Sequence, residues 1–179
     1  MSRSEDTRRK WLMPMAMHVM EHGMGAASLR PLAKAAGTSD RMLIYHFGNK
    51  DALIAELLSF IAESYSVMLD QAFGKDRASS RDQCLNLLLD RIRDPQMQPF
   101  MGLWWEIVAG AARGNQSYRD AAGAIMDRLL LWLESKLPVD DPDPAAGARL
   151  MLVLVEGSLM LEGIGKGDVA KAGLSAAQL

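Results

Sequence analysis

A short stretch near the N-terminus, GTSDRMLIYHFGNKDAL at residues 37–53, carries much hydrogen-bonding capacity and little apolar surface. Its long polar side chains stand close together along the chain: Arg41, Tyr45, His46 and Lys50. Guanidinium, phenol, imidazole and ammonium groups can bind phosphates and the edges of bases. The stretch offers only two obvious core residues, Leu43 and Phe47, so most of it is not made to be buried.

A second pattern could do metal chemistry. Residues 18–22 read His-Val-Met-Glu-His, the H-x-x-E-H spacing of one class of zinc hydrolases. Catalytic zinc needs a third protein ligand and a cleft, and the third histidine, His46, already belongs to the polar stretch above. The motif also falls in the last turn of a predicted helix, where the helix dipole favours histidine. We expect surface histidines and no metal or cofactor; a zinc hydrolase using His18, Glu21 and His22 is the alternative.

Other signatures narrow the class of protein and its compartment. The sequence has no nucleophile elbow, P-loop or dinucleotide fingerprint, so we expect a protein that is not an enzyme. The single cysteine, Cys84, can form no internal disulfide, which favours a reducing cytoplasm. We expect Cys84 to be a core residue and not a reactive thiol. The N-terminus shows no signal-peptide pattern, and no apolar run approaches the roughly 18 residues needed to cross a bilayer. We expect a cytoplasmic protein without a membrane partner.

Charge is distributed unevenly along the 179 residues. The formal net charge is −2, but residues 1–50 carry eight Lys and Arg against four acidic residues, which gives this part +4 and the remainder −6. A basic module on an acidic body is typical of a small nucleic-acid-binding domain carried by another domain. Charge alone does not separate this interpretation from a solvated charged face. The 49% of apolar residues is enough for a sizeable core.

The elements that must position these residues are predicted to be helices throughout. We find no period-two alternation typical of strands, whereas apolar spacing, serine caps and glycine ends indicate helices. Their expected ranges are 5–21, 28–36, 39–47, 50–73, 80–93, 97–113, 117–137 and 144–164. The fold class is therefore expected to be all-α.

The two short helices on either side of Gly37 have the dimensions of a helix-turn-helix. At about 100° per residue, Leu43 and Phe47 share one face of the second helix, while Arg41 and Tyr45 point away from it. A helix that enters the major groove of DNA needs this division between a thin apolar edge and long polar side chains. The outer face of this helix is therefore predicted to contact DNA.

The chain from about residue 11 to residue 58 resembles the DNA-binding head of the TetR family of transcriptional regulators. The matching positions, in order, are Gly23, Ser28-Leu29-Arg30, Leu32-Ala33, Ala36-Gly37, Ser39, Leu43, Tyr45-His46-Phe47, Lys50 and Leu53. The chain departs from the family at Ile44, where members commonly carry the first of two aromatic residues. The resemblance implies a symmetric dimer. Each subunit would have a three-helix head, a linking fourth helix, and a C-terminal helical domain with a ligand pocket and the dimer interface.

The resemblance also implies roles within the chain. Residues 1–50 would form the DNA-binding domain, and residues 51–179 the ligand-binding and dimerisation domain. One group of side chains would mainly hold phosphates: Ser28, Arg30, Thr38, Tyr45, His46 and Lys50. A second group would read bases: Ser39, Asp40, Arg41 and Met42. The partner would be a pseudo-palindromic double-stranded DNA operator.

The larger domain carries Trp, Met and a few polar side chains, which are the usual lining of a small-molecule pocket. The candidates are Tyr65, Met68, Met101, Trp104, Trp105, Glu106, Met126 and Trp132. Plain core packing is the alternative for each of them. Trp105 and Glu106 fall beside the main apolar stripe of their helix, so they are the residues there most expected to face a cavity.

Two later helices carry broad apolar faces that could supply half of a four-helix dimer interface. The candidates are Ile125, Leu129 and Leu133 on the first helix and Leu150, Val153, Leu154, Gly157 and Leu161 on the second. Gly157 would let another helix approach closely. Packing within one chain is the alternative, and some of these residues must serve it.

Together, these patterns predict a cytoplasmic, homodimeric transcriptional regulator. We expect a repressor that leaves its operator when a small apolar or amphipathic effector binds. The alternatives are a DNA-binding regulator with a filled core and no ligand, and the zinc hydrolase.

Overall fold

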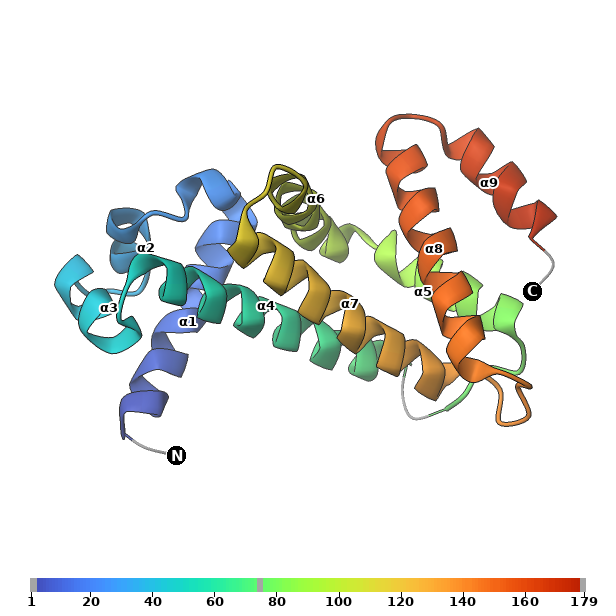
Figure 1. Ribbon diagram of the computed structural model, residues 1–179, viewed down its shortest axis with the longest axis horizontal. Helices are drawn as coiled ribbons and strands as arrows, with labels where there is room; N and C mark the ends of the chain where they lie inside the picture. The colour runs from blue at the N-terminus through green and yellow to red at the C-terminus, as the bar shows by residue number, and fades with distance from the viewer. Residues whose placement is uncertain (1–2, 74–75, 178–179) are drawn as a thin grey trace. The chain divides into compact units, whose positions relative to one another are not determined.

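The structure, a computed structural model, describes residues 3–73 and 76–177, and the regular elements of these residues are helices (Figure 1). The α-helices are α1 (Arg3–His22), α2 (Leu29–Ala35), α3 (Asp40–Phe47), α4 (Lys50–Phe73), α5 (Arg81–Ile92), α6 (Gln98–Ala112), α7 (Gln116–Lys136), α8 (Pro144–Gly163) and α9 (Gly167–Ala176). Two short 3-10 turns, η1 (Met24–Ala26) and η2 (Pro95–Met97), precede α2 and α6. The all-α prediction is confirmed, and each expected helix is present with its ends within two residues. The helix α9 was not predicted.

Local sequence explains the helix ends near the polar stretch. The hydroxyl of Ser39 accepts a hydrogen bond of 3.3 Å from the amide of Met42, which caps α3 as predicted. Ser28 occupies the same position before α2, but its side chain accepts no capping hydrogen bond, so only its position was predicted correctly. Gly48 ends α3 with a φ of 87°, a left-handed conformation that favours glycine. The side chain of Asn49 then caps α4.

The chain forms two compact units. The first contains residues 1–69 and 95–126, and the second contains residues 70–94 and 127–179. Both α4 and α7 therefore contribute to each unit. In the first unit, α6 and the first half of α7 pack with α1, α2 and α3.

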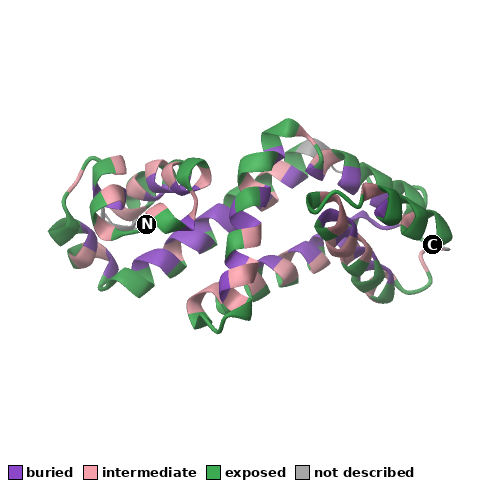
Figure 2. Cartoon of the chain, turned by 90° about the horizontal axis from the view of Figure 1, so that it is seen from above, coloured by how far each residue is buried: buried purple, intermediate pink, exposed green. Residues whose placement is uncertain are grey.

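The first unit is built around one apolar cluster that the first three helices share with α4 and α6. Its buried members include Leu12, Met15, Val19, Leu32, Leu43, Phe47, Leu53, Leu57, Leu103 and Ile107. Each of these helices turns one buried side inward and an exposed side outward (Figure 2). Because Leu103 and Ile107 are only 2% exposed, α6 is part of the same core as α1, α2 and α3.

The second unit buries its own set of side chains from α5, α7 and α8. They include Cys84, Leu85, Leu88, Leu89, Leu133, Leu137, Met151 and Val155. Burial raises the pKa of the Cys84 thiol to about 11, although nearby Lys136 opposes the shift. The thiol therefore stays protonated at neutral pH, in agreement with its expected place in the core. The guanidinium of Arg81 donates two hydrogen bonds of 2.7 Å to Asp141, which ties the start of α5 to the connection before α8.

Two helices are long and apolar enough, by length and composition alone, to cross a membrane: α4 over Lys50–Gln71, and α8. The expectation that no stretch approaches this length does not hold for them. In α4 the apolar side chains Leu53, Leu57 and Ile61 are buried in the cluster described above, as in the core helix of a soluble protein. In α8 only a third of the residues are buried, which leaves an apolar side uncovered within the chain.

Candidate nucleic-acid interface and ligand groove

The recognition helix predicted from the sequence, α3, has two chemically different faces. Leu43 and Phe47 are 0% and 6% exposed and belong to the apolar cluster of the first unit. On the other side Tyr45 is 78% exposed, and Arg41 and Met42 are also exposed. The periodicity of about 3.6 residues per turn produces this division. It leaves hydrogen-bonding side chains free to contact a DNA groove.

The other predicted DNA-binding residues lie on α2, on α3 and at the ends of these helices. Exposed members are Ser28, Arg30, Ser39, Asp40, Arg41, Met42, Tyr45 and Lys50, whereas Thr38 and His46 are half-buried. The turn between the two helices is held by Gly37, with a φ of 64°, and by a 2.9 Å hydrogen bond from the amide of Thr38 to the carbonyl of Ala33. The turn thus presents α3 in a defined orientation to α2.

A chain of aromatic rings, which the sequence did not predict, positions Tyr45. The imidazole of His46 meets the indole of Trp11 edge-to-face, with centroids 5.0 Å apart, and meets the Tyr45 ring at 5.1 Å in the same manner. Such T-shaped contacts are favourable between aromatic rings. Trp11 on α1 therefore supports the exposed end of α3.

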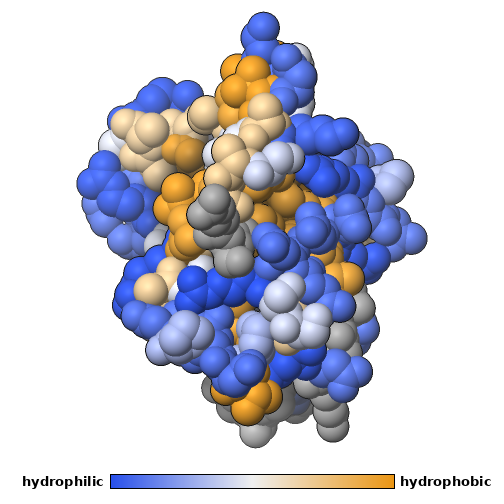
Figure 3. Space-filling view, turned by 90° about the vertical axis from the view of Figure 1, so that its right-hand side faces the viewer, coloured by the Kyte–Doolittle hydropathy of each residue, from blue (hydrophilic) through white to orange (hydrophobic). Residues whose placement is uncertain are grey.

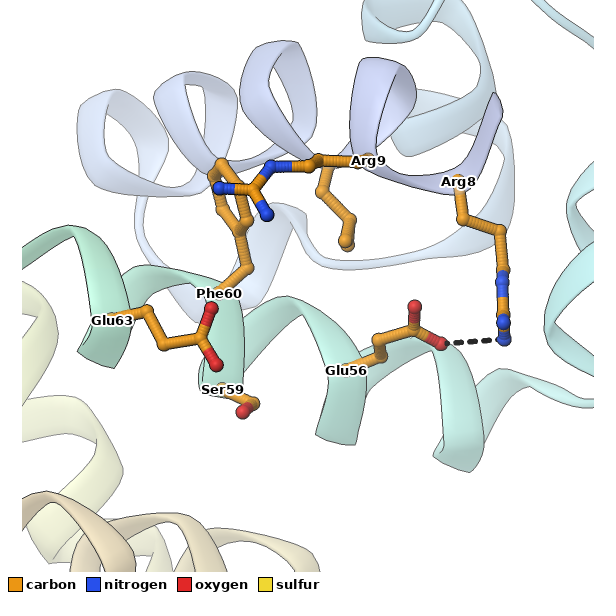
Figure 4. Close-up of a pocket in the computed structure, with 7 residues that line it drawn as sticks. Arg8, Arg9, Glu56, Ser59, Phe60 and Glu63 are labelled. Atoms are coloured by element: carbon orange, nitrogen blue, oxygen red, sulfur yellow. Dashed lines mark hydrogen bonds and ion pairs between the residues drawn. The ribbon is translucent and has the colours of Figure 1, made fainter. Parts of the chain in front are cut away.

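Charged side chains also join α1 to α4. The guanidinium of Arg8 lies 3.3 Å from the carboxylate of Glu56, on the edge of a hollow of about 280 Å³ between the two helices (Figure 4). Arg9 on α1 and Phe60 and Glu63 on α4 also line this hollow. The ion pair between Arg8 and Glu56 is partly exposed, so it orients α1 and α4 more than it stabilises them.

A second hollow, which we call the α6 groove, has a volume of about 500 Å³. It is lined by Met24, Gly25, Trp105, Glu106, Arg113 and Tyr118. The Glu106 carboxylate accepts a hydrogen bond of 2.7 Å from the amide of Met24 in η1. Tyr118 packs against Gly110, where any Cβ would collide with the ring. Burial raises the pKa of Tyr118, Glu106 raises it further and Arg113 opposes both, so these three groups act on one another electrostatically.

The remaining pocket candidates do not line the α6 groove. Tyr65 stacks on Phe100 with ring centroids 3.9 Å apart, and Met101 and Trp104 are 8% and 5% exposed. Met68 and Met126 are half-buried. Trp132 is in the second unit and donates its indole N–H to Asp70 at 2.8 Å. Of the eight candidates, the structure places Trp105 and Glu106 together at one hollow.

The residues predicted for the dimer interface fall into two groups. On α7, Ile125, Leu129 and Leu133 are at most 6% exposed, so they are covered within their own chain. On α8, Leu150 and Val153 are 40% and 70% exposed. Leu154, Gly157 and Leu161 are half-buried.

The histidine pair of the H-x-x-E-H motif does not form a metal-binding arrangement. The imidazoles of His18 and His22 stack with centroids 4.5 Å apart, and His22 Nδ1–H donates to the carbonyl of His18 at 3.0 Å. In the described part of the chain, no group of three His, Cys, Asp or Glu side chains is placed to hold a metal ion.

Comparisons with known proteins agree with this geometry. Residues 16–57 match the family model of bacterial regulatory proteins, tetR family. The HTH-type transcriptional regulator BetI of Rhizobium meliloti (strain 1021) is 28% identical over 156 residues, which are 83% of this chain and 75% of that protein. A solved structure described as a TetR-family transcriptional regulator from Rhodococcus sp. has a TM-score of 0.71 and 23% identity over 95% of each chain. A transcriptional regulator from Streptomyces coelicolor A3(2) has a TM-score of 0.66 and 25% identity over 84% of this chain and 83% of that one.

The matched segment contains α2, the turn and α3, and the structural similarity extends over both compact units. The predicted resemblance and the absence of enzymatic function are thereby confirmed. The chain belongs to the TetR family of DNA-binding, helix-turn-helix transcriptional regulators and is not an enzyme.

Proposed function

We propose that this regulator is a cytoplasmic homodimeric repressor that binds a pseudo-palindromic operator and leaves it when a small apolar or amphipathic effector binds. The division of α3 carries the proposal. Its buried edge, Leu43 and Phe47, fixes the helix to the head, and its exposed side offers Arg41 and Tyr45 to DNA. Residues 1–50 supply the DNA contacts, and residues 51–179 supply effector binding and dimerisation.

Within the head, position along α2 and α3 separates two roles. Side chains in the first turn of α3 read base edges, and these are Ser39, Asp40, Arg41 and Met42. Arg41 has the reach and the paired donors to bind a guanine. The phosphate contacts come from Ser28, Arg30, Thr38, Tyr45, His46 and Lys50. Lys50 is the first residue of α4, where the free amides of the helix N-terminus also favour a phosphate.

The exposed apolar side of α8 is the proposed dimer interface. It continues from Leu150 and Val153 past Leu154, Gly157 and Leu161 to Met160 and Ile164, which are 52% and 68% exposed. Viewed from the side of α8 and α9, apolar surface interrupts the hydrophilic surface (Figure 3). Because an exposed apolar strip of this length is costly in water, a second copy of the helix is the occupant we propose.

The α6 groove is the proposed effector site. It combines an indole, a phenol and two charged side chains, a mixture that suits a small amphipathic molecule. The effector must have a higher affinity for the conformation that does not bind DNA than for the operator-bound conformation. Equal affinity for the two would leave their equilibrium unchanged. The stacking of Tyr65 on Phe100 and the burial of Trp104 favour a second candidate, a regulator whose core takes no ligand.

Selection of binding sites from random DNA by the purified chain tests the proposal. A dimer with two heads should enrich an inverted repeat whose half-sites are centred about 10 base pairs, or about 34 Å, apart. Mapping the enriched sequence in the genome, followed by release assays with metabolites of the neighbouring genes, tests the effector. Absence of any enriched sequence would contradict the DNA-reading role of α3. Absence of release by every compound tested would favour the regulator without a ligand.

A further inference from the structure

The connection between α1 and α2 is held by one carboxylate from another helix. The chain leaves α1 at Gly23, turns through η1 and enters α2 at Leu29. The amide of Met24, the first residue of η1, donates its hydrogen bond to Glu106 on α6, 82 positions further along the chain. The other hydrogen bonds given by the backbone amides of residues 23–28 stay within this connection or reach back into α1.

Gly23 shows how closely the carboxylate approaches this connection. Its φ of 76° is a conformation that other residues rarely adopt. A Cβ at this position would also collide with Oε1 of Glu106. Both oxygens of Glu106 therefore lie against the same two residues, one accepting from Met24 and the other filling the space above Gly23.

The helix that carries Glu106 is itself fixed to the head. Leu103 and Ile107, three residues before and one residue after Glu106, are buried in the apolar cluster that holds α1 and α3. Met24 is also buried there, at 8% exposure. The exposed carboxylate of Glu106 thus joins α6 and η1, two elements that both pack on this cluster, at the point where the chain turns from α1 towards α2.

We propose that Glu106 is a positioning residue for DNA binding: its hydrogen bond to Met24 sets the direction in which α2, and with it α3, leaves α1. Glu106 contacts no DNA and acts through the orientation of the recognition helix. Since Glu106 also lines the α6 groove, a ligand that takes this carboxylate would release the connection. This last step rests on the proposed effector site, whereas the positioning role does not.

Three variants of Glu106 separate reach from charge. Glu106→Gln keeps an acceptor oxygen at the same distance but removes the charge, whereas Glu106→Asp keeps the charge and is one methylene too short to reach Met24. Glu106→Ala removes both. Glu63→Ala, which removes an exposed carboxylate of the same unit, is the matched control. Removing a negative charge by itself should strengthen DNA binding, since DNA is a polyanion. A loss of affinity therefore cannot come from a weaker electrostatic attraction of the chain to DNA.

Operator affinity is measured by fluorescence anisotropy on the site selected by the wild type, and amide exchange of Met24 is followed by mass spectrometry or NMR. We expect Glu106→Ala and Glu106→Asp to bind the operator about tenfold more weakly, with faster exchange at Met24 and nearly unchanged melting temperature. Glu106→Gln should keep most of the affinity, and Glu63→Ala should bind as tightly as the wild type or more so.

Wild-type affinity and unchanged Met24 exchange in both Glu106→Ala and Glu106→Asp would overturn the positioning role. So would a loss in Glu106→Gln without a loss in Glu106→Asp, because charge and not reach would then matter. If the wild type selects no DNA sequence, the proposed function fails separately, and the exchange of Met24 still decides whether Glu106 holds the connection. If Glu106→Ala does not fold, the comparison of Gln with Asp gives the same decision.

Discussion

Arg41 and Lys50 are both exposed cations of the head, but their positions predict different losses. Arg41 is in the first turn of α3, where side chains reach base edges, and Lys50 begins α4 beside the expected phosphates. We predict that Arg41→Ala costs about 1–3 kcal/mol and relaxes base preference at one position of each half-site. Lys50→Ala should weaken binding to all DNA sequences about equally. It should also lower the slope of log affinity against log salt concentration by about one.

Titration of both variants against a set of single-base operator changes, at several salt concentrations, checks this pair of predictions. The other variant serves as the control in each case, because both substitutions remove one positive charge. A uniform loss for Arg41→Ala, with an unchanged specificity profile, would show that Arg41 holds a phosphate.

Two adjacent tryptophans allow a residue-scale test of the α6 groove. Trp104 is 5% exposed and packs in the interior, so its truncation to Ala should cost about 3–5 kcal/mol of unfolding free energy. Trp105 is half-exposed and lines the groove, so Trp105→Ala should cost less and keep operator binding while blunting release by the effector. Thermal melting and operator release measure the two effects. Equal destabilisation by both variants, or unchanged release in Trp105→Ala, would place the effector site elsewhere.

Among the elements, the connection between α7 and α8 depends on a charged pair. The guanidinium of Arg81 on α5 donates to both oxygens of Asp141 and also to the carbonyl of Asp143. The hydrogen bond from Arg81, supported by the amide of Asp143, holds the pKa of Asp141 below its usual value. A lowered pKa means that this carboxylate stabilises the fold above its unfolded pKa, about 3.9, and that the gain is lost as pH falls through the folded pKa.

We therefore predict that Asp141→Asn lowers the melting temperature at pH 7 and that its difference from the wild type shrinks below about pH 4. Asp140→Asn, a neighbouring exposed carboxylate, is the control and should show little difference at either pH. Melting temperatures of the three proteins between pH 3 and pH 7 provide the measurement. A difference that persists unchanged in acid would mean that packing of the amide, and not the lost ion pair, destabilises the variant.

Helix positions were predictable because their signals are local. Ser39 caps α3, Gly48 ends it, and the spacing of Leu43 and Phe47 orients it, and all of these act within one or two turns. The helix α9 was missed because its short sequence, GDVAKAGLSA, contains two glycines and few large apolar residues. Its formation depends on packing against α8, and local sequence patterns do not predict this packing.

The site was less predictable where it depends on contacts distant in sequence. The exposed face of α3 followed from periodicity. In contrast, the ring contact between Trp11 and His46 joins residues 35 positions apart, and the hydrogen bond between Met24 and Glu106 joins residues 82 positions apart. For the same reason the interior role of Tyr65 could not be distinguished from a pocket role, since its stacking partner Phe100 lies on another helix. Residue type and spacing indicate which side of a helix is apolar, but not which partner covers it.

At the scale of the whole molecule, charge and the proposed assembly bear on how the chain binds DNA. The +4 of residues 1–50 attracts the polyanion, and the −6 of the remainder keeps the rest of the chain away from it. In the proposed dimer, operator affinity depends on the second head being present at high effective concentration. Dimerisation is therefore a condition of the function that we propose.

A glutamate at the exposed α8 face tests this dependence. Val153 is 70% exposed, so Val153→Glu should leave the single chain folded, whereas in the proposed dimer it would bury an unpaired charge at the interface. We predict a folded monomer that binds half-sites weakly, because the two heads no longer act together. Val139→Glu, at an even more exposed valine in the connection before α8, is the control and should remain dimeric. Sedimentation velocity at micromolar concentration, followed by operator titration, gives the answer. A wild type that sediments as a monomer, or a Val153→Glu variant that remains a dimer, would show that this face of α8 has another role.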